Sequence, residues 1–249
     1  MSEEWDFYLC RINDQPASIY LNMGLRSEAP IASQPHVVRV RVPMLSPRED
    51  GLSSQQEFED LVRLENSITG SIKGWPAVFV GRTTQGGVRD FYFYSNDPDG
   101  VTNAISSVAT SFPAYALEIG SFEDPQWDEY LGFLYPSARD RERMANRRTI
   151  DALEREGDDL TTPRQIDHWI YLPSASVANE FLLAASKLGF SSTGEVAKVE
   201  GTLGYKAVVS SVAVPNLNDM NEITLQLLEL AQAKGGDYDG WECPVETGH

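Results

Sequence analysis

The chain has 249 residues, is 41% hydrophobic and carries 37 acidic side chains against 20 Lys and Arg, a formal charge of −17. This composition is typical of a folded protein, and the charge argues against partners held through phosphates, whether nucleic acid or an anionic membrane surface. No apolar run approaches the roughly 18 residues of a membrane span, the acidic N-terminus is unlike a signal peptide, and two distant cysteines suggest no disulfide or metal framework, so we expect a cytoplasmic protein with reduced thiols.

Residues 1–136 are predicted to form a first domain. Val38, Val40 and Val42 alternate with Arg39 and Arg41, a pattern typical of a strand with one buried face. Two additional strand-like runs precede it. The predicted strands are 5–13, 17–25, 36–42, 77–82, 89–95 and 115–120. One predicted helix opens at Ser54 in a capping box with Glu57 and is expected to bury Phe58, Leu61, Val62, Ile68 and Ile72. A second helix is predicted near 100–111.

Residues 137–160 are predicted to be a connecting helix that leads into a second domain. The stretch from Ser137 to Glu156 contains no Pro or Gly, and Arg147, Asp151 and Arg155 lie at helical spacing for ion pairs. Gly157 then ends the helix.

Residues 161–249 are predicted to form the second domain, with elements in the order β-α-β-β-α-β. The predicted strands are 166–172, 190–199, 205–214 and 238–245. The first predicted helix has its apolar side chains on one stripe: Val177, Phe181, Ala184, Ala185 and Leu188. The second starts at Asp219, with Glu222 three residues on, and its stripe is Met220, Ile223, Leu227, Leu230 and Ala231. We therefore predict an α+β protein of two domains, each a ferredoxin-like antiparallel sheet with two helices on one face, the first with two extra N-terminal strands.

Motifs for chemistry are sparse. The sequence contains no nucleophile elbow, phosphate loop or paired metal ligands. His168 alternates with Ile166 and Ile170, which favours a buried structural histidine over a catalytic base. The acidic stretches 96–100 and 237–240 match a calcium loop only in part and are expected to be turns. We expect no catalytic residue, no metal and no cofactor.

Two segments, 82–84 and 91–94, have residue types that could bind a ligand or nucleic acid. Arg82, Thr83 and Thr84 end a strand, and a guanidinium beside two hydroxyls could bind a carboxylate or phosphate. The acidic composition favours the other interpretation, an ion pair between Arg82 and a surface acid. The aromatic run 91–94 could stack bases, but only Arg89 lies near it, so no direct nucleic-acid binding is expected.

The C-terminal half resembles the regulator of ribonuclease E activity B family. The resemblance rests on three segments in order: the helix 146–154 followed by Gly157-Asp158-Asp159, the strand around Asp167-His168-Trp169 leading to Leu188-Gly189-Phe190, and the terminal Tyr238-Asp239-Gly240-Trp241-Glu242.

The first half resembles the bacterial domain-of-unknown-function family 695. The residues that carry this resemblance are Trp5-Asp6-Phe7-Tyr8, Pro16-Ala17-Ser18-Ile19, Asp50-Gly51-Leu52, Gly81-Arg82-Thr83-Thr84 and the strand 89–94. That similarity implies no activity and only marks residues 1–136 as a unit.

The ribonuclease-regulator resemblance implies a ferredoxin-like protein that binds an endoribonuclease and inhibits it without chemistry of its own. We therefore expect a non-enzymatic regulator that binds a protein, and the resemblance implies a ribonuclease E-type enzyme as that partner. The sequence leaves the oligomeric state open. Expected contacts are the aromatic anchors Tyr238 and Trp241, Asp239 in a turn or bulge that aims Trp241, and Glu242, Asp167 and Trp169. The alternative is a small-molecule-binding protein or enzyme with a site between the two domains.

Overall fold

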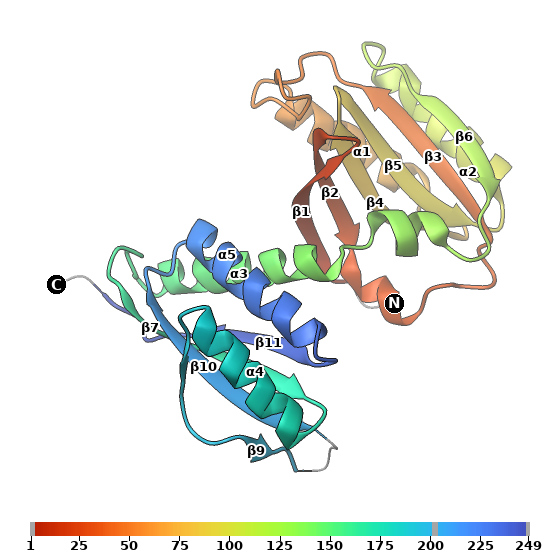
Figure 1. Cartoon of the computed structure of the whole chain (residues 1–249). Helices are drawn as coiled ribbons and strands as arrows, with labels where there is room; N and C mark the ends of the chain where they lie inside the picture. The colour runs from red at the N-terminus through yellow and green to blue at the C-terminus, as the bar shows by residue number, and fades with distance from the viewer. Residues whose placement is uncertain (1–2, 201–203, 248–249) are drawn as a thin grey trace. The chain divides into compact units, whose positions relative to one another are not determined.

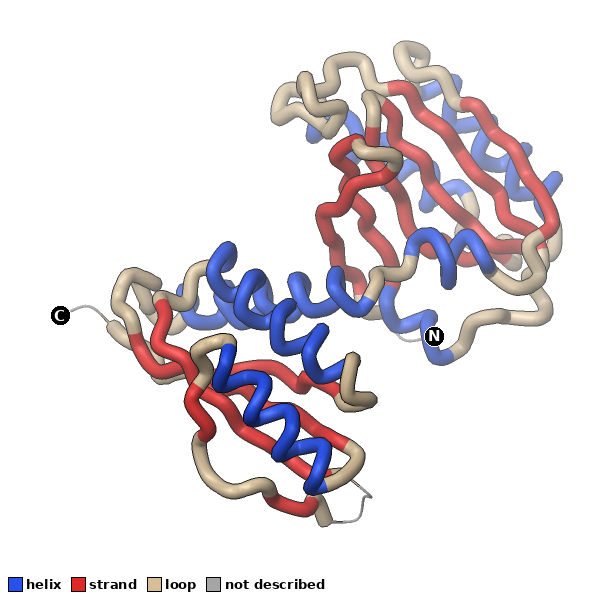
Figure 2. The backbone as a smooth tube through the Cα atoms, viewed as in Figure 1, coloured by secondary structure: helices blue, strands red, loops and turns tan. Residues whose placement is uncertain are grey.

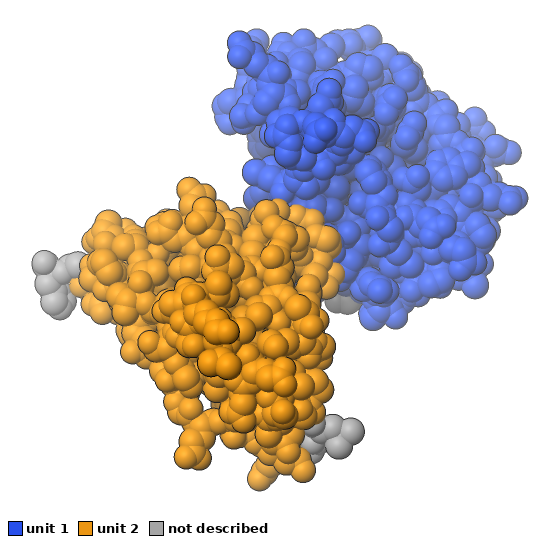
Figure 3. Space-filling view, viewed as in Figure 1, with its two compact units in different colours: residues 1–136 blue, residues 137–249 orange. Residues whose placement is uncertain are grey.

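A computed structural model describes residues 3–200 and 204–247. The turn that we expect at Gly201 and Gly204, between the predicted strands 190–199 and 205–214, lies partly outside the described residues. The chain divides into two compact units, residues 1–136 (unit 1) and 137–249 (unit 2), coloured separately in Figure 3. Each unit is α+β and contains one antiparallel sheet, as predicted. Within the described ranges, no helix is both long and apolar enough to cross a membrane.

Unit 1 contains a six-stranded sheet in the order β1-β2-β4-β5-β3-β6, with every neighbouring pair antiparallel. Two α-helices lie on one side of it, behind the strands in Figure 1. The elements are β1 (Trp5–Ile12), β2 (Gln15–Asn22), η1 (Met23–Ser27), β3 (His36–Pro43), α1 (Phe58–Ser71), β4 (Ala77–Gln85), β5 (Val88–Ser95), α2 (Pro98–Ser106), η2 (Ser107–Ser111), β6 (Glu118–Glu123) and η3 (Glu129–Leu134).

The main core of unit 1 lies between the sheet and its two α-helices. Alternation directs Val38 and Val40 of β3 and Phe93 of β5 toward Leu61 and Ile105 of the helices, and all five are fully buried. Burial of such side chains stabilises the fold by about 1.5–3 kcal/mol each.

A second buried layer lies on the opposite face of the same sheet, where η3 crosses the strands (Figure 1). Tyr94 of β5 stacks on Trp127 with ring centroids 4.0 Å apart, and its hydroxyl donates to Asp124 Oδ2 at 2.5 Å. Trp127 in turn packs edge-on against Tyr130. Both faces of the middle strands are therefore buried, which explains why all but the first residue of β5 are buried.

Unit 2 contains a five-stranded sheet with the path β11-β7-β10-β8, and β9 pairs with β10. The helices of this unit and the strands beneath them are distinguished by colour in Figure 2. The elements are α3 (Ala138–Arg155), β7 (Arg164–Leu172), α4 (Ala175–Lys187), β8 (Ser191–Ser192), β9 (Ala197–Lys198), β10 (Tyr205–Ala213), α5 (Leu217–Gln232) and β11 (Asp237–Glu242).

The core of unit 2 joins alternate residues of β7 and β10 to the helices α4 and α5. Ile170 and Val209 of the sheet pack with Phe181 of α4 and Leu227 of α5. The segment predicted to connect the domains is the helix α3, which belongs to unit 2 and packs against α5 through a separate cluster that includes Ile150.

The predicted start of the first helix differs from the structure. The helix α1 begins at Phe58. Ser54 Oγ accepts from Glu57 N at 3.3 Å, which is one half of the predicted capping box. The Glu57 carboxylate does not complete the box and instead accepts from the backbone N–H groups of Leu45 and Ser46, at 2.7 Å each. Leu61, Ile68 and Ile72 are buried as predicted, whereas Phe58 and Val62 lie beside this buried stripe and are exposed.

Three details of unit 2 also differ from prediction. The helix α5 begins at Leu217, because the Asn216 side chain caps it by accepting from Asp219 N at 3.0 Å. The single strand predicted over 190–199 is two short strands, because Gly194 between them has φ +81° and interrupts the extended backbone. Leu188, predicted to be buried, is half exposed at the end of α4.

Candidate functional site

Alternate side chains of β7 point to opposite faces of the unit 2 sheet, one covered by the helices and one on the outer side. His168 is fully buried on the helix-facing side, where its Nδ1 lies 2.9 Å from the Tyr238 hydroxyl and its ring packs edge-on against Phe190. Burial lowers the pKa of His168 to about 4, so its imidazole is neutral near pH 7. His168 thus has the structural environment that the alternation indicates.

A β-bulge in β11 directs two of the predicted anchors toward the helices. Tyr238 pairs with Ile170 and Trp241 pairs with His168, while the register shifts between Tyr238 and Gly240. Both Tyr238 and Trp241 consequently face the helices although they are three residues apart. The predicted bulge at Asp239-Gly240 is present, and Asp239 is exposed in it.

Trp241 and Tyr238 are held from within the unit. The Trp241 indole donates to Asn146 Oδ1 of α3 at 2.8 Å, and Asn146 Nδ2 donates to Thr224 Oγ1 of α5 at 2.8 Å. Burial, followed by the nearby Glu142 carboxylate, raises the pKa of Tyr238. These contacts give both aromatic side chains a packing role.

The remaining predicted contacts lie on the outer side of the sheet, opposite the helices. Asp167 pairs with Glu242 of β11, and Trp169 pairs with Val208 of β10, so strand pairing places all four on one surface. We call this surface the outer face. Strand pairing places these described residues on it: Gln165, Asp167, Trp169 and Tyr171 of β7, Lys206, Val208, Ser210 and Val212 of β10, and Asp237 and Glu242 of β11.

The outer face combines apolar groups with carboxylates. Val212 is 75% exposed, and the Trp169 and Tyr171 rings are each partly exposed. Asp167 lies two residues from Trp169 on β7, and Glu242 lies opposite Asp167 on β11. An aromatic patch beside acidic groups is chemically suited to bind a protein segment with apolar and basic side chains.

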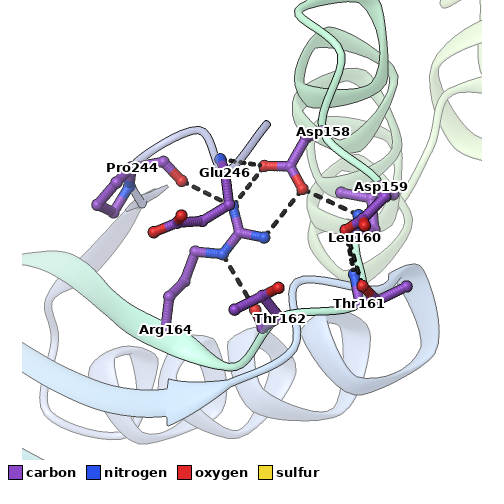
Figure 4. Close-up of polar contacts among 8 residues, drawn as sticks. All are labelled: Asp158, Asp159, Leu160, Thr161, Thr162, Arg164, Pro244 and Glu246. Carbon is purple, nitrogen blue, oxygen red and sulfur yellow. Dashed lines mark hydrogen bonds and ion pairs between the residues drawn. The ribbon is translucent and has the colours of Figure 1, made fainter. Parts of the chain in front are cut away.

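A buried ion pair between Asp158 and Arg164, which we call the clasp, connects the segment that follows β11 to the start of β7 (Figure 4). The Asp158 carboxylate, with no exposed side-chain area, accepts both terminal nitrogens of Arg164, and it also accepts Leu160 N and Glu246 N at 2.9 Å each. Arg164 also donates to the Pro244 carbonyl at 2.8 Å. The Arg164 guanidinium and these N–H donors hold the pKa of Asp158 far below its usual range.

The other predicted site, on β4 in unit 1, does not converge on one ligand position. Arg82 Nε donates to Glu65 Oε2 at 2.7 Å, and its guanidinium lies over the Tyr20 ring. Thr84 shares the helix side with Arg82 and accepts from Arg89 Nε at 3.2 Å, whereas Thr83 faces the opposite side of the sheet. Arg82 thus has the acidic partner that formed the alternative to ligand binding.

Several residues that shape these sites carry no signal in the sequence. Asn146, Glu142 and Thr224 sit at ordinary helical positions, yet they form a buried polar contact between α3, α5 and β11. Val208 and Val212 alternate with buried residues in β10, a pattern that could have indicated the outer face. Across the part of the chain that the structure describes, no group of three or more His, Cys, Asp or Glu could hold a metal ion.

The comparisons with known proteins identify both halves. A model of a family of unknown function (DUF695) matches residues 3–135, and the chain belongs to this family. A second family model, regulator of ribonuclease activity B, matches residues 143–243. Both resemblances expected from the sequence are thereby confirmed.

Matches to individual proteins add little. No curated protein matches the chain. One matching solved structure is an unknown protein from Galdieria sulphuraria, 14% identical with a TM-score of 0.23, over 83% of this chain and 96% of that one. Another is a candidate glycine cleavage system transcriptional repressor, 10% identical with a TM-score of 0.24, over 84% of this chain and 98% of that one. At these TM-scores neither likeness bears on function.

Proposed function

We propose that the chain is a regulator of ribonuclease activity that acts by binding a protein partner, without chemistry of its own, in the cytoplasm. The observation that carries the proposal is the match of residues 143–243 to the family of regulators of ribonuclease activity B. A ribonuclease E-type endoribonuclease is the partner that we propose. The alternative of a ligand site between the two units stays a prediction.

The outer face of unit 2 is the surface that we propose for this contact. Trp169 is its central anchor, because aromatic residues dominate the energetics of protein interfaces and Trp169 lies on the middle of β7. Asp167 and Glu242 would attract basic side chains and accelerate association at low salt. Tyr238 and Trp241, held inside the unit, would support this surface from beneath.

The direct test measures cleavage of a labelled RNA by a purified ribonuclease E-type enzyme, with and without the full chain at low salt. We expect a saturable change in the cleavage rate and a binding curve with the same midpoint. Trp169→Ala should weaken binding by about 30-fold, the effect of losing a hot-spot side chain of about 2 kcal/mol.

Leu183→Ala supplies the matched control. Leu183 is 63% exposed on α4, away from the outer face, so its truncation should leave both the binding midpoint and the cleavage rate unchanged. A cleavage rate that is identical with and without the chain, together with no detectable binding, would refute the proposed function. Equal effects of the two substitutions would refute the assignment of the surface.

A further inference from the structure

Unit 1 contains a cavity that its two added strands create. The core under the helices includes residues of β3, β4 and β5 but none of β1 or β2 among the described residues. The helix side of β1 and β2 is therefore left beside α1 as a groove of about 370 Å³, within the size range of small-molecule sites. We call it the unit 1 groove; its principal lining residues are Trp5, Tyr20, Asn22, Glu65 and Phe79.

One wall of the groove is aromatic. The Trp5 ring stacks on Tyr20 with centroids 5.0 Å apart and on Phe79 with centroids 5.2 Å apart. The three side chains come from three adjacent strands, so the sheet holds them in place. Each is only partly buried, and such rings bind flat aromatic ligands by stacking.

Asn22 contributes a hydrogen-bond donor of fixed orientation. The residue is 4% exposed, and its Oδ1 accepts both Glu4 N at 3.0 Å and Gly24 N at 3.1 Å. Because two N–H donors occupy the oxygen, the amide cannot be flipped. Its Nδ2 has no hydrogen-bond partner anywhere in residues 3–200 and 204–247, and Asn22 lines the groove.

Glu65 contributes an acceptor from the α1 side. Its Oε2 accepts from Arg82 and lies 3.6 Å from Nη1 of the buried Arg89. Its Oε1 accepts no hydrogen bond from any described residue, and the side chain lines the groove. The ion pairs thus fix the carboxylate while one oxygen stays open to a ligand.

We propose that the unit 1 groove binds a planar nitrogen heterocycle that carries an amino group. The ring stacks on Trp5, the amino group donates to Glu65 Oε1, and a ring nitrogen accepts from Asn22 Nδ2. Glu3 at the groove and the charge of −17 disfavour anionic ligands, so the ligand is neutral or cationic. This site is independent of the contact proposed for unit 2.

Calorimetric titration of the full chain with adenine and with purine tests the proposal, because purine lacks only the amino group. We expect adenine to bind with a Kd on the order of 1 mM, reasonable for a ligand of this size. Purine should bind about tenfold more weakly, because the bond to the Glu65 carboxylate is lost.

Three variants locate the binding. Trp5→Leu should weaken adenine by about tenfold through loss of stacking, and Glu65→Gln should reduce the preference for adenine over purine. Trp75→Leu is the control, because Trp75 is 40% exposed in the same unit but lies against Gly100 of α2 and not in the groove. Circular dichroism confirms that each variant is folded.

No saturable adenine binding up to 5 mM, five times the expected Kd of about 1 mM, would overturn the proposal. Equal affinities for adenine and purine in the unsubstituted chain would also overturn it. If Trp5→Leu fails to fold, the preference measured on Glu65→Gln decides; an unchanged preference there, or weakening by Trp75→Leu equal to that by Trp5→Leu, would refute the assigned site.

Discussion

Replacing Asp158 by Asn should strongly destabilise unit 2. The carboxylate has no exposed side-chain area and accepts from Arg164 as well as from Leu160 N and Glu246 N. An amide has one oxygen in place of two, and its NH₂ group would face a donor. Because the Arg164 side chain is only 4% exposed, the substitution also leaves a buried charge without its partner, which costs about 3–5 kcal/mol.

Hydrogen exchange measured by mass spectrometry on the full chain is the appropriate assay, because a protein of two units need not unfold in one step. The slowest amides of β7 should exchange about 10²- to 10⁴-fold faster in Asp158→Asn, as a loss of about 3–5 kcal/mol requires. The control is Asp159→Asn, an exposed neighbour whose carboxylate, among the described residues, accepts hydrogen bonds from Thr161 alone.

The pH dependence gives an independent check on the clasp. Arg164 holds the folded pKa of Asp158 below the unfolded value of about 3.9. The contribution of the clasp is therefore complete above that value and is lost as the pH falls toward the folded pKa. Asp158→Asn should remove this part of the acid sensitivity. Exchange rates in Asp158→Asn equal to those in Asp159→Asn would refute the reasoning.

Two further predictions concern the helix-facing side of β11. The Cε1–H resonance of His168 should titrate with a midpoint near pH 4. Since the unfolded imidazole titrates near pH 6.5, lowering the pH from about 6.5 to 4 should destabilise unit 2. A midpoint above pH 6 would contradict the argument that burial lowers the pKa of His168. Trp241→Phe should lower the free energy of unfolding of unit 2 by about 1–3 kcal/mol, because it leaves Asn146 Oδ1 without its hydrogen-bond donor. Binding of the ribonuclease by the folded variant should not change. Weaker binding at unchanged stability would instead show that Trp241 contacts the partner.

The sequence pattern predicted most elements because their signals are local. Alternation located β3, β7 and β10, and the charge spacing located α3, with limits within a few residues of the observed ones. These signals arise from the burial of one face and from contacts one helical turn apart.

The predictions that failed depended on distant contacts. Glu57 could have capped its own helix, but Leu45 and Ser46, which bind its carboxylate, are brought there by the path of the preceding loop. Phe58 and Val62 are exposed because the sheet covers only the stripe that contains Leu61, Leu64 and Ile68. A local pattern cannot distinguish between such competing partners.

The candidate contacts show the same limit. Tyr238 and Trp241 have the composition of interface anchors, and the sequence does predict the bulge beside them. It does not predict that Asn146, 95 residues before Trp241, supplies the acceptor for its indole. Residue type directed attention to β11, and tertiary contacts determine which side chains of that strand are enclosed within unit 2.

The clasp around Asp158 has a consequence for β11, an edge strand of the unit 2 sheet. Edge strands are the elements most readily exchanged between identical chains, which leads to domain-swapped dimers. Detaching β11 would require breaking the bonds to Asp158 and Arg164 together with those of Tyr238 and Trp241. Exchange of this strand between two copies is therefore expected to be slow.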